Sequence, residues 1–481
     1  MSLALLALAA DAFAGPIDVH GFGAAAMGRG LGGVALHDGV SDTFRNPAGL
    51  QRLRGAQALV GYTWMRHQLT PPGSVRWDTN RDGRVDEDDA PLSVSADYGR
   101  ADGIQIGLAK PIGGRIGLGI AASFPIDRIL DISTFEPSLP TWFLYENRLR
   151  RYEASVGFGW LLLPGLRVGG SAQVLTRARY DVSATLTGQV RSAEAADDDV
   201  AELISAVTLD VHEMSLELEP NLAPIIAVQW DVGETVKPLD GLQFGATWRG
   251  EAGLPVDVSV DLQINAEIEE VGDLEATTIA LLAPFSLALL DHYVPEQWSG
   301  GIAWVSPERL RVYGDVRYTR WDRLPVNVAA VSSGEVSGQL FADSAVPIAD
   351  GNDFLLELAA TWSGRFGAEV SLPPIGAVRT LVRGGWSFEP TPLRRVGPDV
   401  SLLDTDRTVF TGGLGVGHDG LLGLFNGPVS WDVYFQHHPL ADGQVNVSYS
   451  DEFTPGAPID GGGVPVGGRL WSAGGQWRIV Y

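Results

Sequence analysis

Six positions between residues 78 and 89 have the spacing of a calcium-binding loop. Asp78, Asn80 and Asp82 fall on alternate positions, and Gly83 follows them where such a loop turns sharply. Carboxylate, amide and carbonyl oxygens are the hard ligands that Ca²⁺ prefers. The pattern predicts a structural calcium ion with ligands from Asp78, Asn80, Asp82, Arg84 (through its carbonyl oxygen), Asp86 and Asp89. An acidic, solvated loop without a metal is the alternative interpretation.

The composition excludes several other kinds of chemistry. The chain has 481 residues and no cysteine, so it can form neither disulfides nor thiolate metal sites. Its 34 Lys and Arg residues against 59 Asp and Glu give a net charge of −25, which argues against nucleic acid as a partner. The motifs of zinc proteases, serine hydrolases and phosphate-binding loops are missing, and His437 and His438 have no third ligand nearby, so we do not expect an enzyme.

The residues of the predicted calcium loop lie between β-strands, because apolar and polar residues alternate along much of the chain. The alternation is clearest in residues 309–321, 382–389, 429–436 and 471–481. Arg311 and Asp315 lie at mid-strand on the polar face, which suits a water-filled lumen and not a packed core. On the apolar face, aromatic residues lie near the strand ends, where the interfaces of a membrane would be.

Short turns and long connections alternate between these strands. Seven long connections occur, at residues 69–91, 129–147, 190–210, 269–293, 323–351, 391–406 and 439–464. Short turns at one end and long loops at the other are typical of an outer-membrane barrel. The sequence therefore predicts an all-β fold, a transmembrane antiparallel β-barrel of about 14 strands in a bacterial outer membrane. Tyr481 ends the last strand as an aromatic signal for the barrel-assembly machinery.

Two of the long connections are more apolar than a solvated loop should be. The third has apolar residues at helical spacing within residues 197–209, and the fourth is almost wholly apolar from residue 277 to residue 290, interrupted by Pro284. Exposed apolar segments of this kind need a partner. We expect them to capture an apolar ligand through Val200, Leu203, Ile204, Val207, Leu281, Leu282, Phe285 and Leu289. Packing of two helices on each other over the barrel mouth is the alternative.

The first residues predict export. Residues 1–14 contain an apolar run that ends in Ala12-Phe13-Ala14, which is a cleavage pattern of exported proteins. We interpret this stretch as the remnant of a signal peptide. No later run reaches the ~18 consecutive apolar residues that a membrane helix needs.

The segment from Gly21 to Leu50 points to a family. It is rich in Gly and Ala, and it contains the triplet Asn46-Pro47-Ala48 shortly before a predicted strand. This stretch resembles the start of the FadL/TodX outer-membrane transporters of long-chain fatty acids and aromatic hydrocarbons. Further segments resemble the family in the same order, at residues 118–125, 244–251, 315–321, 382–393 and 471–481.

The resemblance implies a hatch of residues 15–54, with Asn46, Pro47 and Ala48 as its motif, inside a barrel formed by residues 55–481. It implies passive transport of hydrophobic small molecules such as long-chain fatty acids, other lipids or hydrocarbons. Hatch movement would link a lumenal pocket to a lateral opening near the third strand, expected at residues 115–128. The protein would be a monomer surrounded by outer-membrane lipid.

Two other functions stay open at this stage. A general polar porin would have the same barrel but would need no sealing hatch. A surface binding or adhesion protein would retain a ligand on its long loops without passing it through the wall. The triplet Asn46-Pro47-Ala48 could also be an ordinary turn with no role in transport.

Overall fold

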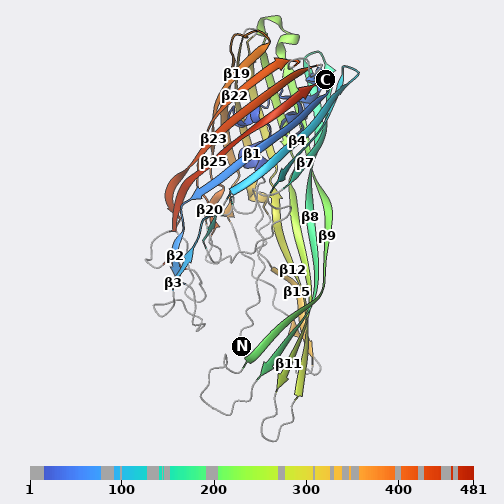
Figure 1. Ribbon diagram of the computed structural model, residues 1–481, viewed down its shortest axis with the longest axis vertical. Helices are drawn as coiled ribbons and strands as arrows, with labels where there is room; N and C mark the ends of the chain where they lie inside the picture. The colour runs from blue at the N-terminus through green and yellow to red at the C-terminus, as the bar shows by residue number, and fades with distance from the viewer. Residues whose placement is uncertain are drawn as a thin grey trace.

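The computed structural model describes residues 16–76, 91–97, 100–126, 140–142, 145, 152–190, 204–268, 277–306, 309–324, 330–338, 346–347, 357–395, 402–420, 427–445, 457–458 and 464–481. Most of these residues are in β-strands, and short helices occur near the N-terminus (Figure 1). Among the described residues, no helix is both long enough and apolar enough to cross a bilayer.

Fourteen strands form one closed antiparallel barrel. In ring order they are β1 (Gln57–Leu69), β4 (Arg100–Ile112), β5 (Ile116–Pro125), β7 (Glu153–Leu163), β8 (Leu166–Val190), β9 (Ile204–Asp231), β10 (Leu242–Arg249), β13 (Gln297–Val305), β14 (Leu310–Thr319), β18 (Thr361–Ser371), β19 (Val378–Glu389), β22 (Arg407–Asp419), β23 (Pro428–Val445) and β25 (Val464–Val480). β25 pairs with β1 along its length, so the ring has no open edge. The predicted barrel of about 14 strands is confirmed.

The two faces of the wall differ in the way that the alternation predicts. Trp298 and Trp304, toward opposite ends of β13, point outward and are 53 % and 42 % exposed. Between such aromatic residues the outer face is a band of exposed aliphatic side chains, which suits lipid. The inner face is polar, and Gln105, Asp315 and Asp432 are buried there.

Six strands continue beyond the barrel at the end that carries the long connections (Figure 1). β8 and β9 extend past the wall, and β11 (Ala252–Ile268) pairs with β8 in parallel. β12 (Thr277–Val294), β15 (Ala330–Gly338) and β16 (Val346–Pro347) add to β11 in turn, all antiparallel. We call these six strands the extended sheet.

The extended sheet corrects the helical interpretation of the third and fourth connections. Ile204 and Val207 lie in β9, and residues 277–290 lie in β12. The apolar spacing near Val207 fits a strand as well as a helix, and β8 supplies the pairing partner that decides between them. Pro284 can be accommodated in β12 because, among the described strands, β15 pairs with Leu282 and Phe285 but not with Pro284.

Shorter elements lie over the two ends of the barrel. At the long-connection end they are β2 (Gly73–Arg76), β3 (Pro91–Val94), β6 (Thr141–Trp142), β17 (Glu357–Leu358), β20 (Leu393–Arg395), β21 (Leu402–Leu403), β24 (Ala457–Pro458) and the 3₁₀ turn η6 (Trp321–Arg323). β6 pairs in parallel with β21, so two distant connections meet over the mouth. At the other end, the turn between β9 and β10 contains η4 (Val232–Glu234) and η5 (Lys237–Leu239).

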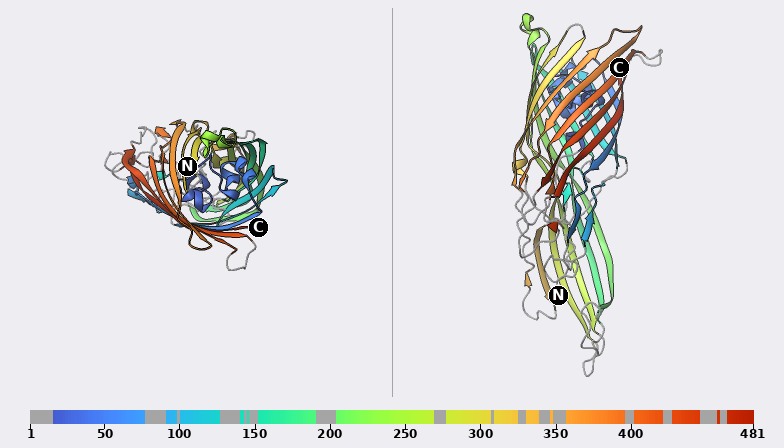
Figure 2. Two further views of the ribbon diagram at one scale, coloured as in Figure 1. Left: turned by 90° about the horizontal axis from the view of Figure 1, so that it is seen from above. Right: turned by 90° about the vertical axis from the view of Figure 1, so that its left-hand side faces the viewer.

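The N-terminal residues fold inside the barrel, as both views in Figure 2 show. Their elements are α1 (Pro16–His20), α2 (Ala24–Met27), η1 (Gly39–Ser41), α3 (Asp42–Arg45) and η2 (Pro47–Arg52). We call residues 16–54 the hatch. The exact division at residues 14/15 and 54/55 stays a prediction, and the expected signal peptide lies outside the described residues.

Candidate functional site

The hatch folds as a chain of single turns because its sequence provides no continuous apolar face for a longer helix. Gly23 and Gly30 take φ angles of 83° and 92°, a region that residues with a side chain rarely adopt. These reversals let the segment fill the lumen compactly. Small apolar residues such as Ala35 and Ala48 are fully buried within it.

The triplet Asn46-Pro47-Ala48 joins the hatch to itself and to the wall. Asn46 is extended, and its side-chain oxygen accepts a hydrogen bond from the Ala48 amide at 3.1 Å, which caps η2. Its side-chain nitrogen donates to the Val34 carbonyl at 2.7 Å and to the Val228 carbonyl of β9 at 3.2 Å. Pro47 occupies the first turn, where its missing N–H is not needed.

Glycines on the inner wall allow the hatch backbone to touch the strands. A Cβ on Gly159 of β7 would lie 2.6 Å from the Pro47 carbonyl oxygen, and one on Gly117 of β5 would overlap the Leu50 carbonyl. Gly169 of β8 faces the Ala48 amide equally closely. Backbone therefore packs directly on backbone, which leaves no room for water between the hatch and these three strands.

A buried ion network fixes the opposite side of the hatch. The Arg29 guanidinium lies 2.6 Å from the Asp38 carboxylate and 3.5 Å from the carboxylate of Glu369 on β18. Arg45 also pairs with Asp38 and lies 3.1 Å from Asp42. Tyr313 of β14 donates its hydroxyl hydrogen to the Arg29 carbonyl at 2.5 Å. The hatch is thus held by charge as well as by shape.

The network sets the charge state of its hatch residues. Burial opposes ionisation of Asp38, but the Arg29 and Arg45 guanidiniums outweigh it and hold the pKa of Asp38 well below its usual range. The pKa of Arg45 is raised above its usual value, because Asp38 and Asp42 outweigh the effect of burial. The ion pairs therefore persist throughout the neutral and mildly acidic range.

Side chains of the wall form hydrogen bonds with backbone groups of the hatch. Asp315 of β14 accepts hydrogen bonds from the amides of Gly33 at 2.5 Å and Val34 at 3.1 Å. Four inward glutamines also bond to the hatch backbone. Gln105 and Gln476 accept hydrogen bonds from its amides, and Gln229 and Gln436 donate to its carbonyls. The strand alternation predicts Asp315, Gln436 and Gln476 on the polar face of the wall, but it does not predict that these glutamines bond to the hatch. The sequence feature that marks these glutamines is their place at inward-facing positions of strands that are otherwise aliphatic or rich in glycine.

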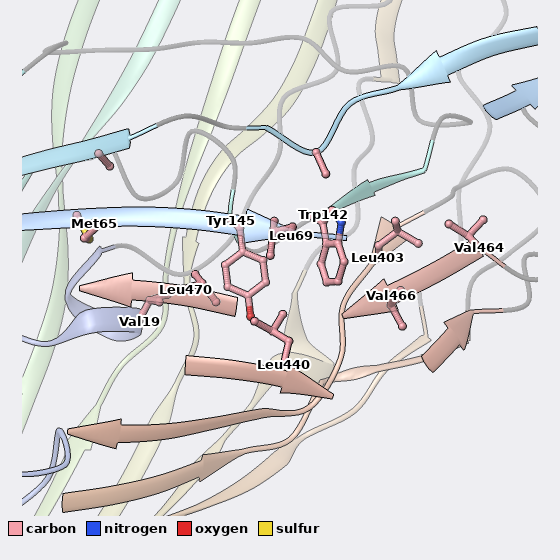
Figure 3. Packing of buried hydrophobic residues seen from close by; sticks show 12 residues of the cluster. Val19, Met65, Leu69, Trp142, Tyr145, Leu403, Leu440, Val464, Val466 and Leu470 are labelled. Carbon is pink, nitrogen blue, oxygen red and sulfur yellow. The ribbon is translucent and has the colours of Figure 1, made fainter. Parts of the chain in front are cut away.

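An apolar cluster packs beside α1 of the hatch at the long-connection end (Figure 3). Its members are Val19, Met65, Leu69, Ala96, Ala101, Trp142, Tyr145, Leu403, Leu440, Val464, Val466 and Leu470. Trp142 of β6 is fully buried and donates its indole N–H to the Thr70 carbonyl at 3.1 Å. We call these residues the mouth cluster. It gives an otherwise polar lumen an apolar region next to the mouth.

Three cavities lie beside α1, between the hatch and the wall. The largest of the three beside α1, about 80 Å³, is lined by residues of α1, of the hatch and of β14, and includes Ile17, Gly21 and Arg317. A second cavity of about 60 Å³ shares Arg317 with it and reaches Tyr145 of the mouth cluster. A third, of about 10 Å³, lies where His20 and Gly21 face Phe124 and Pro125 of β5.

The other predicted site residues have different outcomes. The calcium ligands Asp78, Asn80, Asp82, Arg84, Asp86 and Asp89 lie outside the described residues, as do Val200 and Leu203. Within the described residues, no group of three or more His, Asp or Glu converges to hold a metal ion. In the extended sheet, Leu281 and Phe285 share one face by register, and Leu282 falls on the other.

The closed barrel, apolar outer band and occupied lumen define a plugged channel of the bacterial outer membrane. The sequence matches, over residues 5–420, the family described as outer membrane protein transport protein (OMPP1/FadL/TodX). The chain therefore belongs to this family of outer-membrane transporters of hydrophobic substrates, which confirms the resemblance of residues 21–50.

Solved structures support the same fold. A Pseudomonas aeruginosa FadL homologue aligns with a TM-score of 0.50 and 13 % identity, over 95 % of this chain and 96 % of that chain. The Pseudomonas putida toluene transporter TodX aligns with a TM-score of 0.51 and 12 % identity, over 96 % and 99 %. At such low identity the likeness concerns the fold alone. A comparison with curated protein sequences gives no significant match.

Proposed function

We propose that this protein carries hydrophobic small molecules passively across the outer membrane, with the hatch as its gate. The observation that supports this most directly is the mouth cluster, because a buried apolar region at the entrance of a polar lumen suits an apolar ligand. A general polar porin would need an open polar path, and in the described residues the hatch fills that path.

The cavities favour a route that leaves through the wall. Gly21 lines both the 80 Å³ cavity and the 10 Å³ cavity next to Phe124 and Pro125 of β5, the third strand of the barrel. A small movement of α1 would join the two. β5 pairs with β4 and β7 without a register shift, so the lateral opening that we propose there would need hatch movement and not a pre-existing bulge.

An unpaired guanidinium favours a ligand with a carboxylate. Arg317 lines the two larger cavities and has no hydrogen-bond or ion-pair partner among the described residues. Its neighbours Arg249 and Arg365 are paired with Asp18 and Glu389, each at 2.7 Å. A fatty acid would neutralise Arg317 with its head group while its tail reached the mouth cluster. We therefore propose a long-chain fatty acid ahead of a plain hydrocarbon such as toluene.

The test compares two ligands that differ only in the head group, hexadecanoic acid and hexadecanol. The wild type should bind and pass both into liposomes and prefer the acid. Arg317→Gln should weaken acid binding by roughly tenfold or more and leave the alcohol unaffected, because a charge-assisted hydrogen bond contributes about 1.5–3 kcal/mol. Equal loss for both ligands would refute the role of Arg317, and retention without transfer to the lumen would favour a surface binding or adhesion protein.

Two further proposals concern residues at the cell surface. We propose that the loop of residues 78–89 binds one structural calcium ion, supported by the spacing of its oxygen ligands. We also propose that the extended sheet captures apolar ligand, supported by the apolar phase of β12. We also propose monomeric assembly and insertion by the barrel-assembly machinery, supported by the closed ring of strands.

A further inference from the structure

Three histidines meet where the first helix of the hatch touches the wall. His20 ends α1, and the centroid of its ring lies 5.1 Å from that of His438 on β23 and 6.4 Å from that of His67 on β1. From sequence alone, His438 had no partner beyond His437. In the structure two histidines from distant segments lie near His438. His437 is not part of this group, because its ring stacks on Trp471 with the ring centroids 4.0 Å apart.

The strand register explains how the wall holds two of them together. β25 lies between β1 and β23, and Leu470 of β25 is the register partner of both His67 and His438. The two imidazoles therefore flank Leu470 on the lumenal face. His20 is held against this row by Gln436, whose side-chain nitrogen donates to the His20 carbonyl at 3.1 Å.

The site is dry and offers little to a charged ring. His20 and His438 are 1 % and 0 % exposed. Two members of the mouth cluster are close in sequence: Val19 precedes His20, and Met65 lies two residues before His67. Within the part of the chain that the structure describes, neither ring nitrogen of His20 has a hydrogen-bond partner. The Nε2 atom of His438 lies 3.1 Å from the Gln436 side-chain oxygen.

The charged groups that face the cluster oppose its protonation. Arg407 of β22 repels a proton on His20 or His438, and its counter-ion Glu389 of β19 is already paired with Arg407 and Arg365. Among the described residues, no carboxylate forms an ion pair with His20 or His438. Burial first, and then His67 and Arg407, hold the pKa of His20 well below its usual range.

We propose that His20, His67 and His438 form a proton-operated latch, which holds α1 against the wall at neutral pH and releases it in acid. In the latched state the His20 ring is neutral, whereas a released ring in water titrates near its ordinary pKa of about 6.5. The released state therefore binds more protons once the pH falls below that value. Between pH 7 and pH 5, each histidine that becomes exposed shifts the equilibrium toward release by roughly 25-fold.

Release would be local, since the ion pairs of Asp38 with Arg29 and Arg45 hold the remainder of the hatch to itself throughout this range. Asp38, held ionised by Arg29 and Arg45, keeps its ion pairs well below pH 5. Gly21 lines both the 80 Å³ and the 10 Å³ cavities and His20 lines the smaller one, so release of α1 would join the two cavities beside β5. The meaning of this step for transport rests on the proposed function, but the latch itself does not.

The latch can be tested without any ligand. The chain has no cysteine, so Ile17→Cys provides a unique site for a nitroxide label, and Ile17 lines the 80 Å³ cavity, which has room for it. The full-length protein in liposomes should give an immobilised spectrum at pH 7.5 and a growing mobile fraction between pH 6.5 and pH 5. The His20→Gln/His67→Gln/His438→Gln variant should give the same spectrum at both pH values.

Two variants serve as matched controls. His37→Gln changes a hatch histidine that lies 2.6 Å from Asp42, outside the cluster, and His437→Gln changes the outward neighbour of His438. Both should keep the wild-type transition. The proposal is overturned if wild-type mobility is constant from pH 7.5 to pH 5, or if the triple variant keeps the transition. If heat-modifiable gel mobility shows that the triple variant misfolds, His20→Gln alone must lower and broaden the transition.

Discussion

At the scale of single residues, the seal between hatch and wall depends on glycines that leave space for backbone. Gly159→Ala would place a methyl group 2.6 Å from the Pro47 carbonyl oxygen, so the hatch must shift. We expect a loss of about 1–3 kcal/mol in stability from overpacking and a higher ion conductance in planar bilayers. Gly300→Ala of β13 is the control, because nothing lies within 4 Å of its added methyl group. Equal conductance in both variants would contradict a seal at Gly159.

Asp404 should make the mouth sensitive to pH in the opposite direction from the histidine latch. Burial raises the pKa of Asp404 to about 7, and one of its oxygens accepts a hydrogen bond from Thr391 at 2.6 Å. Between about pH 4 and pH 7 the folded state keeps a proton that the unfolded state has lost, so this residue makes folding less favourable as the pH rises.

The variant Asp404→Asn should remove that dependence. We expect it to be more stable than the wild type at pH 8, by at most about 4 kcal/mol, and to differ little at pH 5. Thermal unfolding followed by gel mobility at both pH values measures this. Parallel pH profiles for the two proteins would show that Asp404 is already ionised when folded.

The calcium loop is also a prediction at the residue scale. Asp82→Ala removes one of the alternate oxygen ligands and should abolish saturable calcium uptake while the barrel remains folded. Isothermal titration should give one site per chain for the wild type. Titration without saturation by the wild type would mean that residues 78–89 are only an acidic surface.

The sequence predicts the place of a single residue only where that place depends on a few neighbouring positions of the chain. The Asn46-Pro47-Ala48 triplet and the lumenal phase of Asp315 were visible, because capping geometry and strand alternation extend over a few positions. The contact between His20 and His438 could not be predicted from the sequence, since it depends on the register of β1, β25 and β23 and on how the hatch lies in the lumen. Pairing register is a property of the closed ring and not of any one segment.

At the scale of elements, the extended sheet shows how pairing overrides an ambiguous local pattern. Apolar residues in β9 and β12 also fit helical spacing, but β8 and β11 alternate strictly and offer long edges. By register, Val260 of β11 pairs with Val182 of β8 and with Phe285 of β12, so apolar positions form rows across strands. Cross-strand rows of this kind stabilise a sheet.

These rows of apolar residues predict which substitutions in β12 weaken ligand capture. Phe285→Asp places a charge on the apolar face of β12 and should weaken uptake of a long-chain ligand by at least roughly tenfold at limiting concentration. Leu282→Asp is the matched control, because Leu282 pairs with Gln263 and falls on the opposite face of the same strand. Uptake of labelled ligand measures both. Normal uptake by a folded Phe285→Asp variant would remove the extended sheet from the mechanism.

At the scale of the whole molecule, closure of the barrel explains why so polar a lumen is possible in a membrane. The ring satisfies the backbone of every strand within the bilayer, so the inner face need not be apolar. The hatch then uses the buried wall charges, such as Glu369, Arg365 and Asp315, as its own hydrogen-bond partners. Without the hatch, those groups would line a hydrated pore.

Deletion of residues 15–50 should therefore turn the protein into an open, poorly selective channel. Glu369, Arg365 and Asp315 would lose their hatch partners and become hydrated, so ion conductance in planar bilayers should rise sharply. Uptake of a long-chain ligand should not rise with it, because the cavities beside α1 are partly built from the hatch itself. Conductance unchanged in a correctly folded deletion variant would place the seal in the elements over the mouth, and a parallel rise in ligand uptake would reduce the hatch from a gate to a simple obstruction.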